Sequence, residues 1–536
     1  MQRKFQPTVD ECTSAFACRP GVLNPQINQR NQIFLLRSIA VAALVSFATM
    51  SDAAPGDFDT SFGTGGVARI SGDAALPTES FATSLGLDAS GRLLVAGIAT
   101  QTRTGVFARL QPSGARDSGL GGSGYVLRPA AGSTYTREPV QVFSLENGNV
   151  ILTESTLRPC FGSPGGCAVN NIFIPLLEAT RLRADGSVDS TYGTKSGMTG
   201  LGFLPTSVTA DKDGALSVMG VQNLFPAPNL GLARIDMNGL VSATPNFATL
   251  STAIHCGDAY SALPTKLVTV RHTNNRLLVA QLLKREATQQ NEFSITRLNQ
   301  DGTRDTSFGN SGQTVISDAR LASHFPFKIM VRSDNAINIL LLDGPPKVLH
   351  QPALIRLTAN GLPDAGQGNQ GILFPLPAAV SSIAAATLQA DDKLLFAGFG
   401  SKFVSGAFVI DESRPLVGRQ ASSAGVVDFS FGSLRGGFTN LVIGGERIDP
   451  ADIVAAADGS IFVAGGIGTL SPAGPTLMAV AKLLGDTPAP ASNPANNESG
   501  GGGCGITRNS DAPIDPTLLM MALIAAAMLL GNRRNR

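Results

Sequence analysis

Residue types that commonly do chemistry are sparse in this chain. Histidine occurs four times, and no histidine stands in an HExxH sequence. No serine stands in GxSxG, so the nucleophile turn of a serine hydrolase is missing as well. We expect the histidines to be loop or strand-edge residues rather than general bases, and we assign no catalytic residue. They are His255, His272, His324 and His350.

Metal and cofactor sites have equally weak signals. The sequence DKDG from Asp211 to Gly214 is similar to the start of a calcium loop, but the downstream bidentate acid of such a loop is missing. We interpret the segment as a tight turn and expect neither a metal nor a cofactor.

The six cysteines fall in different regions. Cys160 and Cys167 bracket the flexible sequence FGSPGG, and we predict a disulfide between them in an oxidising compartment. The alternative is zinc ligation together with His255 and Cys256, but the spacing is not CxxC.

A repeated motif decides the architecture. DTSFGTGG at Asp59 returns in altered form along the chain, and a worn copy, ATPNF, stands at 243–247, which gives a period of about 60 residues. The further copies begin at Asp117, Asp189, Asp305, Asp364 and Asp428.

Three further elements recur in each period. An apolar run such as RLLVAG at Arg92 appears seven times, a segment such as FARLQPSG at Phe107 follows it, and an alternating strand such as 81–91 precedes it. Seven units of four short antiparallel strands predict an all-β fold, a seven-bladed β-propeller over 54–486, with a solenoid as the runner-up. The repeated apolar slots should face the space between blades. They are Phe62, Leu94, Val95, Leu110, Leu278, Phe308, Leu395 and Phe431.

Ring closure has two possible forms. Either each motif opens its own blade, or the strand beginning near Asp59 completes the blade that the last segment, AVAKLLGD at Ala479, leaves open.

The repeat resembles that of the delta-60 repeat family of bacterial exported proteins. The matching positions are Asp59 to Gly63, Gly91 to Gly97, Arg181 to Ser187 and Arg297 to Gly309, and the resemblance covers 57–486. The chain departs from the family pattern at three places, where individual blades should be distorted. They are Leu120 and Gln367, in place of phenylalanine, and the atypical segment 408–420, in which we take FVIDESRP as the third repeated element. The resemblance implies export and no shared activity.

The N-terminal 53 residues have the pattern of a leader with a signal peptide. The apolar stretch 33–50 follows Arg30 and ends at Ser51-Asp52-Ala53, so we predict cleavage after Ala53. The alternative is a retained membrane anchor. The polar leader before it is long, and translation starting near Val22 would explain it.

The C-terminal region resembles the tripartite sorting signals of Gram-negative bacteria. A flexible linker spans 487–503, and the sorting signal spans 504–536, with an apolar transmembrane stretch at 517–531 and terminal arginines. The stretch would span only about 22 Å as a helix, short of the roughly 30 Å bilayer core, which favours a processed tail over a plain membrane anchor. The sorting residues would be Gly500, Gly501, Gly502, Gly503 and Cys504, with Cys504 as the attachment point.

Charge and aromatic content limit the classes of partner that the protein can bind. Residues 54–503 carry 32 Lys/Arg and 35 Asp/Glu, without a basic stripe, so we expect no nucleic-acid partner. Tryptophan is absent, although sugar-binding grooves usually offer aromatic platforms. We therefore expect a non-enzymatic cell-envelope scaffold or binding module whose partners are an unknown envelope ligand, the export and sorting machinery and the membrane. The alternative is an envelope hydrolase or lyase with its active site at the central channel of the propeller.

Overall fold

The computed structural model describes residues 53–486 apart from short gaps, and these residues belong to one compact unit. The gaps are 72–78, 129–135, 160–172, 194–197, 202–203, 212, 223–228, 243–259, 286–289, 344–351, 375–379, 405–406, 422–425, 433–436 and 471–475. In the described part, 29 strands and two 3-10 turns, η1 (Thr273–Asn275) and η2 (Ala319–Leu321), are found. Within these residues no helix has the length and apolar character needed to cross a membrane.

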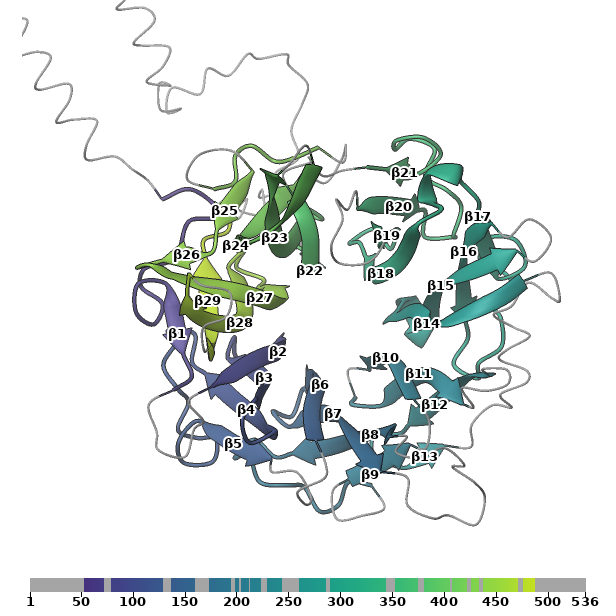
Figure 1. Ribbon diagram of the computed structural model, residues 1–536. Coiled ribbons are helices and arrows are strands. Elements are labelled where there is room, and N and C mark those ends of the chain that lie inside the picture. The colour runs from purple at the N-terminus through teal and green to yellow at the C-terminus, as the bar shows by residue number, and fades with distance from the viewer. Residues whose placement is uncertain are drawn as a thin grey trace, which may run out of the picture. The chain divides into compact units, whose positions relative to one another are not determined.

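The strands form seven antiparallel sheets arranged as a seven-bladed β-propeller, as the repeat predicts (Figure 1). The strands of blades 1 to 6 run in chain order from the innermost to the outermost, and in blade 7 the N-terminal strand is added at the outer edge. Blade 1 contains β2 (Ser80–Leu87), β3 (Leu93–Ala99), β4 (Thr104–Leu110) and β5 (Tyr125–Arg128). Blade 2 contains β6 (Thr136–Ser144), β7 (Val150–Pro159), β8 (Phe173–Leu182) and β9 (Met198–Leu201). Blade 3 contains β10 (Leu204–Ala210), β11 (Leu216–Gln222), β12 (Asn229–Ile235) and β13 (Val241–Ser242).

The remaining blades follow the same order. Blade 4 contains β14 (Tyr260–Arg271), β15 (Leu277–Arg285), β16 (Asn291–Leu298) and β17 (Gln313–Ile316). Blade 5 contains β18 (His324–Val331), β19 (Ile337–Asp343), β20 (Ala353–Leu357) and β21 (Ile372–Leu373). Blade 6 contains β22 (Val380–Leu388), β23 (Leu394–Val404), β24 (Ala407–Gln420) and β25 (Phe438–Asn440). Blade 7 contains β26 (Val442–Ile443), β27 (Glu446–Ala455), β28 (Ile461–Thr469), β29 (Thr476–Leu483) and the N-terminal β1 (Val67–Arg69).

The N-terminal strand closes the ring. β1 pairs antiparallel with β29, with Val67 opposite Ala481, so the second of the two possible closures is the one that forms. The preceding segment also binds blade 6, because the Pro55 carbonyl accepts a hydrogen bond from the Gly432 N–H at 2.7 Å. The two ends of the repeat region therefore share one sheet, and opening the ring requires breaking that sheet.

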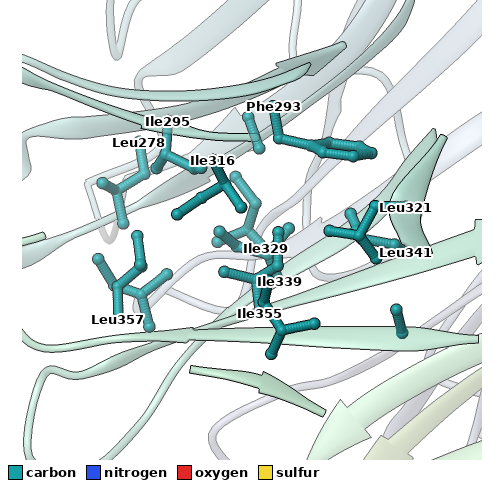
Figure 2. Packing of buried hydrophobic residues seen from close by; sticks show 14 of the residues in the cluster. Leu278, Phe293, Ile295, Ile316, Leu321, Ile329, Ile339, Leu341, Ile355 and Leu357 are labelled. Atoms are coloured by element: carbon teal, nitrogen blue, oxygen red, sulfur yellow. The ribbon is translucent and has the colours of Figure 1, made fainter. Parts of the chain in front are cut away.

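The core is divided among the seven spaces between blades. Each of seven buried apolar clusters joins two successive blades, and Figure 2 shows the cluster between blades 4 and 5, where Leu278 and Ile295 face Ile339 and Ile355. The second strands are buried almost throughout because sheets pack on both of their faces. All eight residues predicted to fill the repeated slots are at most 1% exposed, which confirms the prediction.

The sixth repeat corrects the sequence interpretation at one place. FVIDESRP was taken as its third element, but residues 407–411 instead extend a hairpin in which Asp411 pairs with Gly400. The part of β24 that matches the other blades lies later, since Arg419 stands opposite Leu395 as Arg109 stands opposite Leu94. An insertion in the hairpin displaced the repeat from its expected spacing.

Candidate functional site

The innermost strands line the centre of the ring (Figure 1), and six of them carry a β-bulge at the same place. In blades 2, 3, 5 and 7 a proline precedes the bulge, as in Pro326 and Pro450. Proline lacks an N–H and is tolerated where the ladder is interrupted. The residue directly after the bulge is polar in five of these six blades. These residues are Ser84, Gln141, Ser207, Lys328 and Asp452.

Three of these side chains connect neighbouring blades. Ser84 accepts a hydrogen bond from the Val142 N–H at 3.2 Å, and Ser207 accepts one from the Thr269 N–H at 3.1 Å. Asp452 accepts one from the Leu85 N–H at 2.8 Å, which joins blade 7 to blade 1. These bonds satisfy backbone donors at the inner edge of the ring, where no further strand can pair.

The innermost strands of blades 2 to 5 enclose a cavity of about 620 Å³, which we call the channel cavity. Its size is typical of small-molecule sites. Its wall combines the hydroxyls of Thr206 and Thr209 with the aromatic rings of Phe143 and Phe327. The wall therefore offers hydrogen-bonding groups beside apolar faces.

Two polar atoms and one cation of the channel cavity are available to a ligand. Within the described part of the chain, neither Thr209 Oγ1 nor Gln141 Oε1 has a hydrogen-bond partner, although both atoms are buried. Among the residues that the structure describes, Lys328 makes no ion pair. Burying polar groups without partners costs free energy, so these three groups are the ones that a bound molecule would satisfy.

The second cation of the cavity, Arg271, is already neutralised. Its Nε lies 2.5 Å from an oxygen of Asp211, and its Nη2 donates to Ser217 Oγ at 2.8 Å. Burial raises the pKa of the Asp211 carboxyl against the opposing charges of Arg271 and Arg234, and burial lowers the pKa of Arg271. Asp211 is thus part of a buried ion pair at the turn it was predicted to form, where Gly214 N–H donates to the Asp211 carbonyl.

Asp452 lies on β27, the long strand of blade 7 that borders the centre of the ring, and the pKa of its carboxyl is shifted. Burial raises its pKa, against the lowering effects of Lys328 and of hydrogen bonds from the Leu85 and Ile453 N–H groups. A carboxyl with a raised pKa at the centre of a propeller is a candidate proton donor or acceptor.

The histidines that the structure describes lie at the ends of strands. His272 is buried beside η1, and its Nε2 lies 3.0 Å from the Asn335 carbonyl. Burial lowers the pKa of His272. His324 begins β18 and is also buried. Ala53 is the first described residue and is exposed. Several residues singled out in the sequence lie outside the described residues, namely His255, His350, Cys160, Cys167, Cys256 and the sorting residues Gly500 to Cys504.

Sequence reasoning missed a second repeated contact, which we call the arginine clamp. In blade 4, Arg297 Nε donates to Asp305 at 2.6 Å and Nη1 donates to the Ala359 carbonyl of blade 5 at 2.9 Å. The guanidinium lies 4.8 Å from the ring centre of Phe308, a cation–π contact. Gly361 of the same blade 5 turn has φ +82°, and a Cβ there would lie 2.5 Å from the Phe308 ring. The turn glycine therefore leaves room for the ring.

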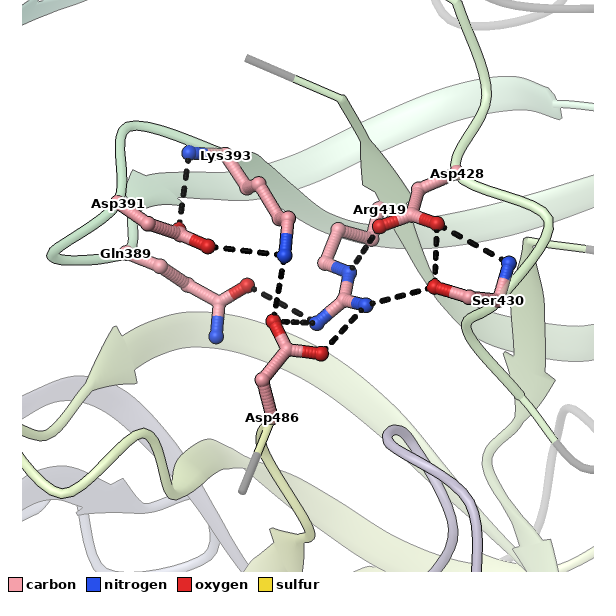
Figure 3. A network of polar contacts seen from close by, with 7 residues as sticks. All are labelled: Gln389, Asp391, Lys393, Arg419, Asp428, Ser430 and Asp486. Atoms are coloured by element: carbon pink, nitrogen blue, oxygen red, sulfur yellow. Dashed lines mark hydrogen bonds and ion pairs between the residues drawn. The ribbon is translucent and has the colours of Figure 1, made fainter. Parts of the chain in front are cut away.

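The clamp recurs around the ring and is most extensive in blade 6 (Figure 3). The matching Nε to carboxylate pairs are Arg109 to Asp117 at 2.6 Å, Arg181 to Asp189 at 2.8 Å and Arg419 to Asp428 at 2.9 Å. In blade 6, Asp486 takes the place of the turn carbonyl and accepts from Arg419 Nη1 at 2.9 Å and from Lys393 Nζ at 2.6 Å. A signal in the sequence existed, since five of the six motif aspartates stand eight or nine residues after an arginine, whereas Asp59 pairs with Lys482 of β29.

Fold and repeat together define a β-propeller repeat protein. Residues 89–119 and 286–308 match a family model described as a domain of unknown function (DUF5122) beta-propeller, which supports the repeat interpretation. None of the curated proteins matches the chain.

Several solved structures are similar in fold. One is the polysaccharide lyase Uly1, with 9% identity and a TM-score of 0.45, covering 79% of this chain and 93% of that one. A PL25 ulvan lyase has 9% identity and a TM-score of 0.42, covering 75% and 91%. A sialidase of Trypanosoma rangeli has 8% identity and a TM-score of 0.34, covering 81% and 57%.

These findings contradict the expectation that the chain is not an enzyme. That expectation rested on missing short catalytic motifs, whereas similar propeller structures are those of lyases and sialidases. Catalytic groups in a propeller come from different blades, far apart in sequence, so no short motif need mark them. The likeness itself shows the fold alone, and the activities named belong to those proteins.

Proposed function

We propose that this protein binds an acidic saccharide in the channel cavity. The observation that carries the proposal is the convergence on one cavity of Lys328, Gln141 Oε1 and Thr209 Oγ1, for which the described residues supply no ion-pair or hydrogen-bond partner. An unpaired ammonium suits a carboxylate or sulfate group, and the amide and hydroxyls suit sugar hydroxyls. Phe143 and Phe327 offer apolar faces on which the C–H face of a sugar ring can pack.

The proposed setting is the bacterial cell envelope. It rests on the predicted signal peptide, with cleavage after Ala53, and on the predicted C-terminal sorting signal around Cys504. Acidic polysaccharides are common outside the cell, so an exported propeller with one unpaired cation in its cavity has a plausible ligand class there.

The binding test compares an oligo-uronate with a neutral oligosaccharide of the same length by titration calorimetry. We expect the oligo-uronate to bind and the neutral sugar to bind at least about tenfold more weakly, because one charge-assisted hydrogen bond is lost. Lys328→Met should remove this preference. Arg320→Gln, which changes an exposed cation paired with Asp318 at 2.7 Å, is the matched control and should bind like the parent. Equal binding of both sugars by the parent would refute the proposal.

A second candidate is cleavage of that ligand, as a hydrolase or lyase with its active site at the central channel. The specific observation is Asp452 of blade 7, which lies outside the lining of the channel cavity but has Lys328 of that cavity as its electrostatic neighbour, and whose pKa is raised by burial. Incubation with the bound oligo-uronate would release new reducing ends, and elimination would also give an unsaturated product that absorbs ultraviolet light. Asp452→Asn keeps an acceptor for the Leu85 N–H and removes the base, so turnover should vanish while binding persists. If the parent protein binds the oligo-uronate and forms no products, the cleavage candidate is wrong and only the binding function is supported.

A further inference from the structure

Blade 5 contains a second, smaller cavity, which we call the blade 5 pocket. Its volume is about 170 Å³, and it lies at the ends of β19 and β20 and under the motif that begins at Asp364. Its polar lining consists of Arg332, Asp334, Asn338, Arg356, Asp364 and Gln367. The pocket is separate from the channel cavity, since the two share no lining residue.

At two positions of the repeat where blades 4 and 6 have apolar side chains, blade 5 has amide side chains, and both line this pocket. Asn338 of β19 stands opposite Arg356 of β20. At the same position of blades 1, 4 and 6, Leu94, Leu278 and Leu395 stand opposite the arginine of the repeat. Gln367 stands where blades 4 and 6 have Phe308 and Phe431, which pack with Leu278 and Leu395. Blade 5 has therefore replaced both members of one apolar contact by hydrogen-bonding groups.

Asn338 is the strongest sign of a ligand. Its side chain is fully buried, and among the residues that the structure describes neither Nδ2 nor Oδ1 has a hydrogen-bond partner. Leaving a buried amide without partners is costly, and the same position is apolar in blades 1, 2, 4, 6 and 7. Gln281 and Gln420 are also buried amides without partners among the described residues, but Asn338 differs from them because it lines a pocket, where a ligand can supply its hydrogen bonds.

The charges around Asn338 limit what the ligand can be. Arg356 is almost fully buried and donates through Nη1 to Gln367 Oε1 at 2.9 Å. The ion pairs of Arg332 with described residues are long, 3.4 Å to Asp334 and 3.7 Å to Asp392. Two guanidinium groups favour a carboxylate in the pocket, whereas Asn338 Oδ1 and the rim carboxylates of Asp334 and Asp364 require a hydrogen-bond donor on the ligand.

We propose that the blade 5 pocket binds a small organic carboxylate that carries a hydroxyl or amino group on the neighbouring carbon. The carboxylate lies against the guanidinium groups and accepts from Asn338 Nδ2, and the adjacent donor satisfies Asn338 Oδ1. The ligand differs from the polymer of the channel cavity in size, and its site lies at the interface between blades 5 and 6, because Ser333 of the same turn donates to Asp392 at 2.6 Å.

The test titrates the purified protein with glycolate, acetate and inorganic phosphate. We expect glycolate to bind at least about tenfold more tightly than acetate, because only glycolate can donate to Asn338 Oδ1. Asn338→Leu, which restores the residue type of blades 1, 4 and 6, should lose glycolate binding by about tenfold or more while its thermal melt stays equal to or above that of the parent. Asn338→Asp keeps the shape, adds a negative charge and should also lose binding.

Three outcomes would overturn the proposal. They are equal binding of acetate and glycolate, binding of phosphate in preference to glycolate, and undiminished glycolate binding by Asn338→Leu. Lys328→Met, in the channel cavity, should bind glycolate as the parent does, so failure of the saccharide proposal and failure of this one are distinguishable.

Discussion

Blades 5 and 6 use the same strand positions for opposite purposes. In blade 6, Arg419 lies over Phe431 and joins Asp428, Ser430 and Asp486 in one satisfied network (Figure 3). In blade 5, the phenylalanine is Gln367 and its apolar partner is Asn338, whose buried amide has no protein partner. The comparison shows that the repeat can give up a stabilising contact in one blade because six other interfaces still hold the ring.

Phe308→Ala should have the largest effect among these changes. The ring is fully buried between blades 4 and 5 and is covered by Arg297, so its loss leaves a cavity. We expect the free energy of unfolding to fall by about 3–5 kcal/mol, measured by denaturant titration. Gln367→Ala, at the same position of blade 5, is the matched comparison and should cost less, about 1.5 kcal/mol, because it removes only the hydrogen bond that Gln367 accepts from Arg356. Equal losses for the two variants would mean that blades 4 and 5 do not differ as described.

Arg419→Met comes next. The guanidinium is fully buried and touches two carboxylates, and methionine keeps much of the packing volume without the charge. Breaking a buried ion pair leaves its partner uncompensated, and we expect a loss of about 3 kcal/mol, reduced because Asp486 is partly exposed. The same measurement on Arg320→Gln, an exposed pair, should show a loss below about 1 kcal/mol. A loss that small for Arg419→Met would show that the clamp contributes no stability.

The clamp should also give the protein a particular sensitivity to acid. Burial acts to raise the pKa of Asp428 and of Asp486, but hydrogen bonds from Ser430 and Lys393 and the charge of Arg419 outweigh it, so both pKa values lie below the usual 3.8. Groups with a lowered pKa in the folded state stabilise it above the unfolded value and lose that contribution as the pH falls below about 4.

Unfolding of the parent and of Arg419→Met between pH 3 and pH 7 measures this effect. The stability difference between them should be constant near neutral pH and should shrink as the pH falls below about 4. A difference that stays constant over the whole range would mean that these carboxylates do not titrate with the clamp.

The sequence predicts the fold well and the sites poorly, for a physical reason. Burial of Phe62, Leu94 or Phe431 follows from a local pattern that repeats, so it can be read in one period. The channel cavity depends on Gln141, Thr209 and Lys328, which ring closure brings together from blades 2, 3 and 5. A proline two residues before the polar residue, as at 139–141 and 326–328, was the available signal, and its meaning depends on the bulge that the structure reveals.

The departures at Leu120 and Gln367 show the same limit. Both were visible as missing phenylalanines, yet Leu120 still packs in the cluster between blades 1 and 2, whereas Gln367 lines a polar pocket. The outcome depends on the partner position, which is Leu94 in the first case and Asn338 in the second. A substitution in a repeat is therefore informative only together with the residue that it contacts.

The smallest expected effect gives the sharpest test of this pairing. If Asn338 and Gln367 form one polar replacement of an apolar contact, Asn338→Leu and Gln367→Phe together should recreate the interface of blades 4 and 6. We expect the double variant to gain about 1 kcal/mol of stability, because an unsatisfied buried amide is removed and a ring packs on the new leucine. Each single variant should gain less than about a quarter of this, so that a double-mutant cycle gives a favourable coupling of at least about 0.5 kcal/mol. The converse change in blade 4, Leu278→Asn, should destabilise the protein, since that blade has a phenylalanine where blade 5 has Gln367. Additive single effects in blade 5 would show that the two amides were replaced independently, and the pocket between them would then be an accident of two unrelated substitutions.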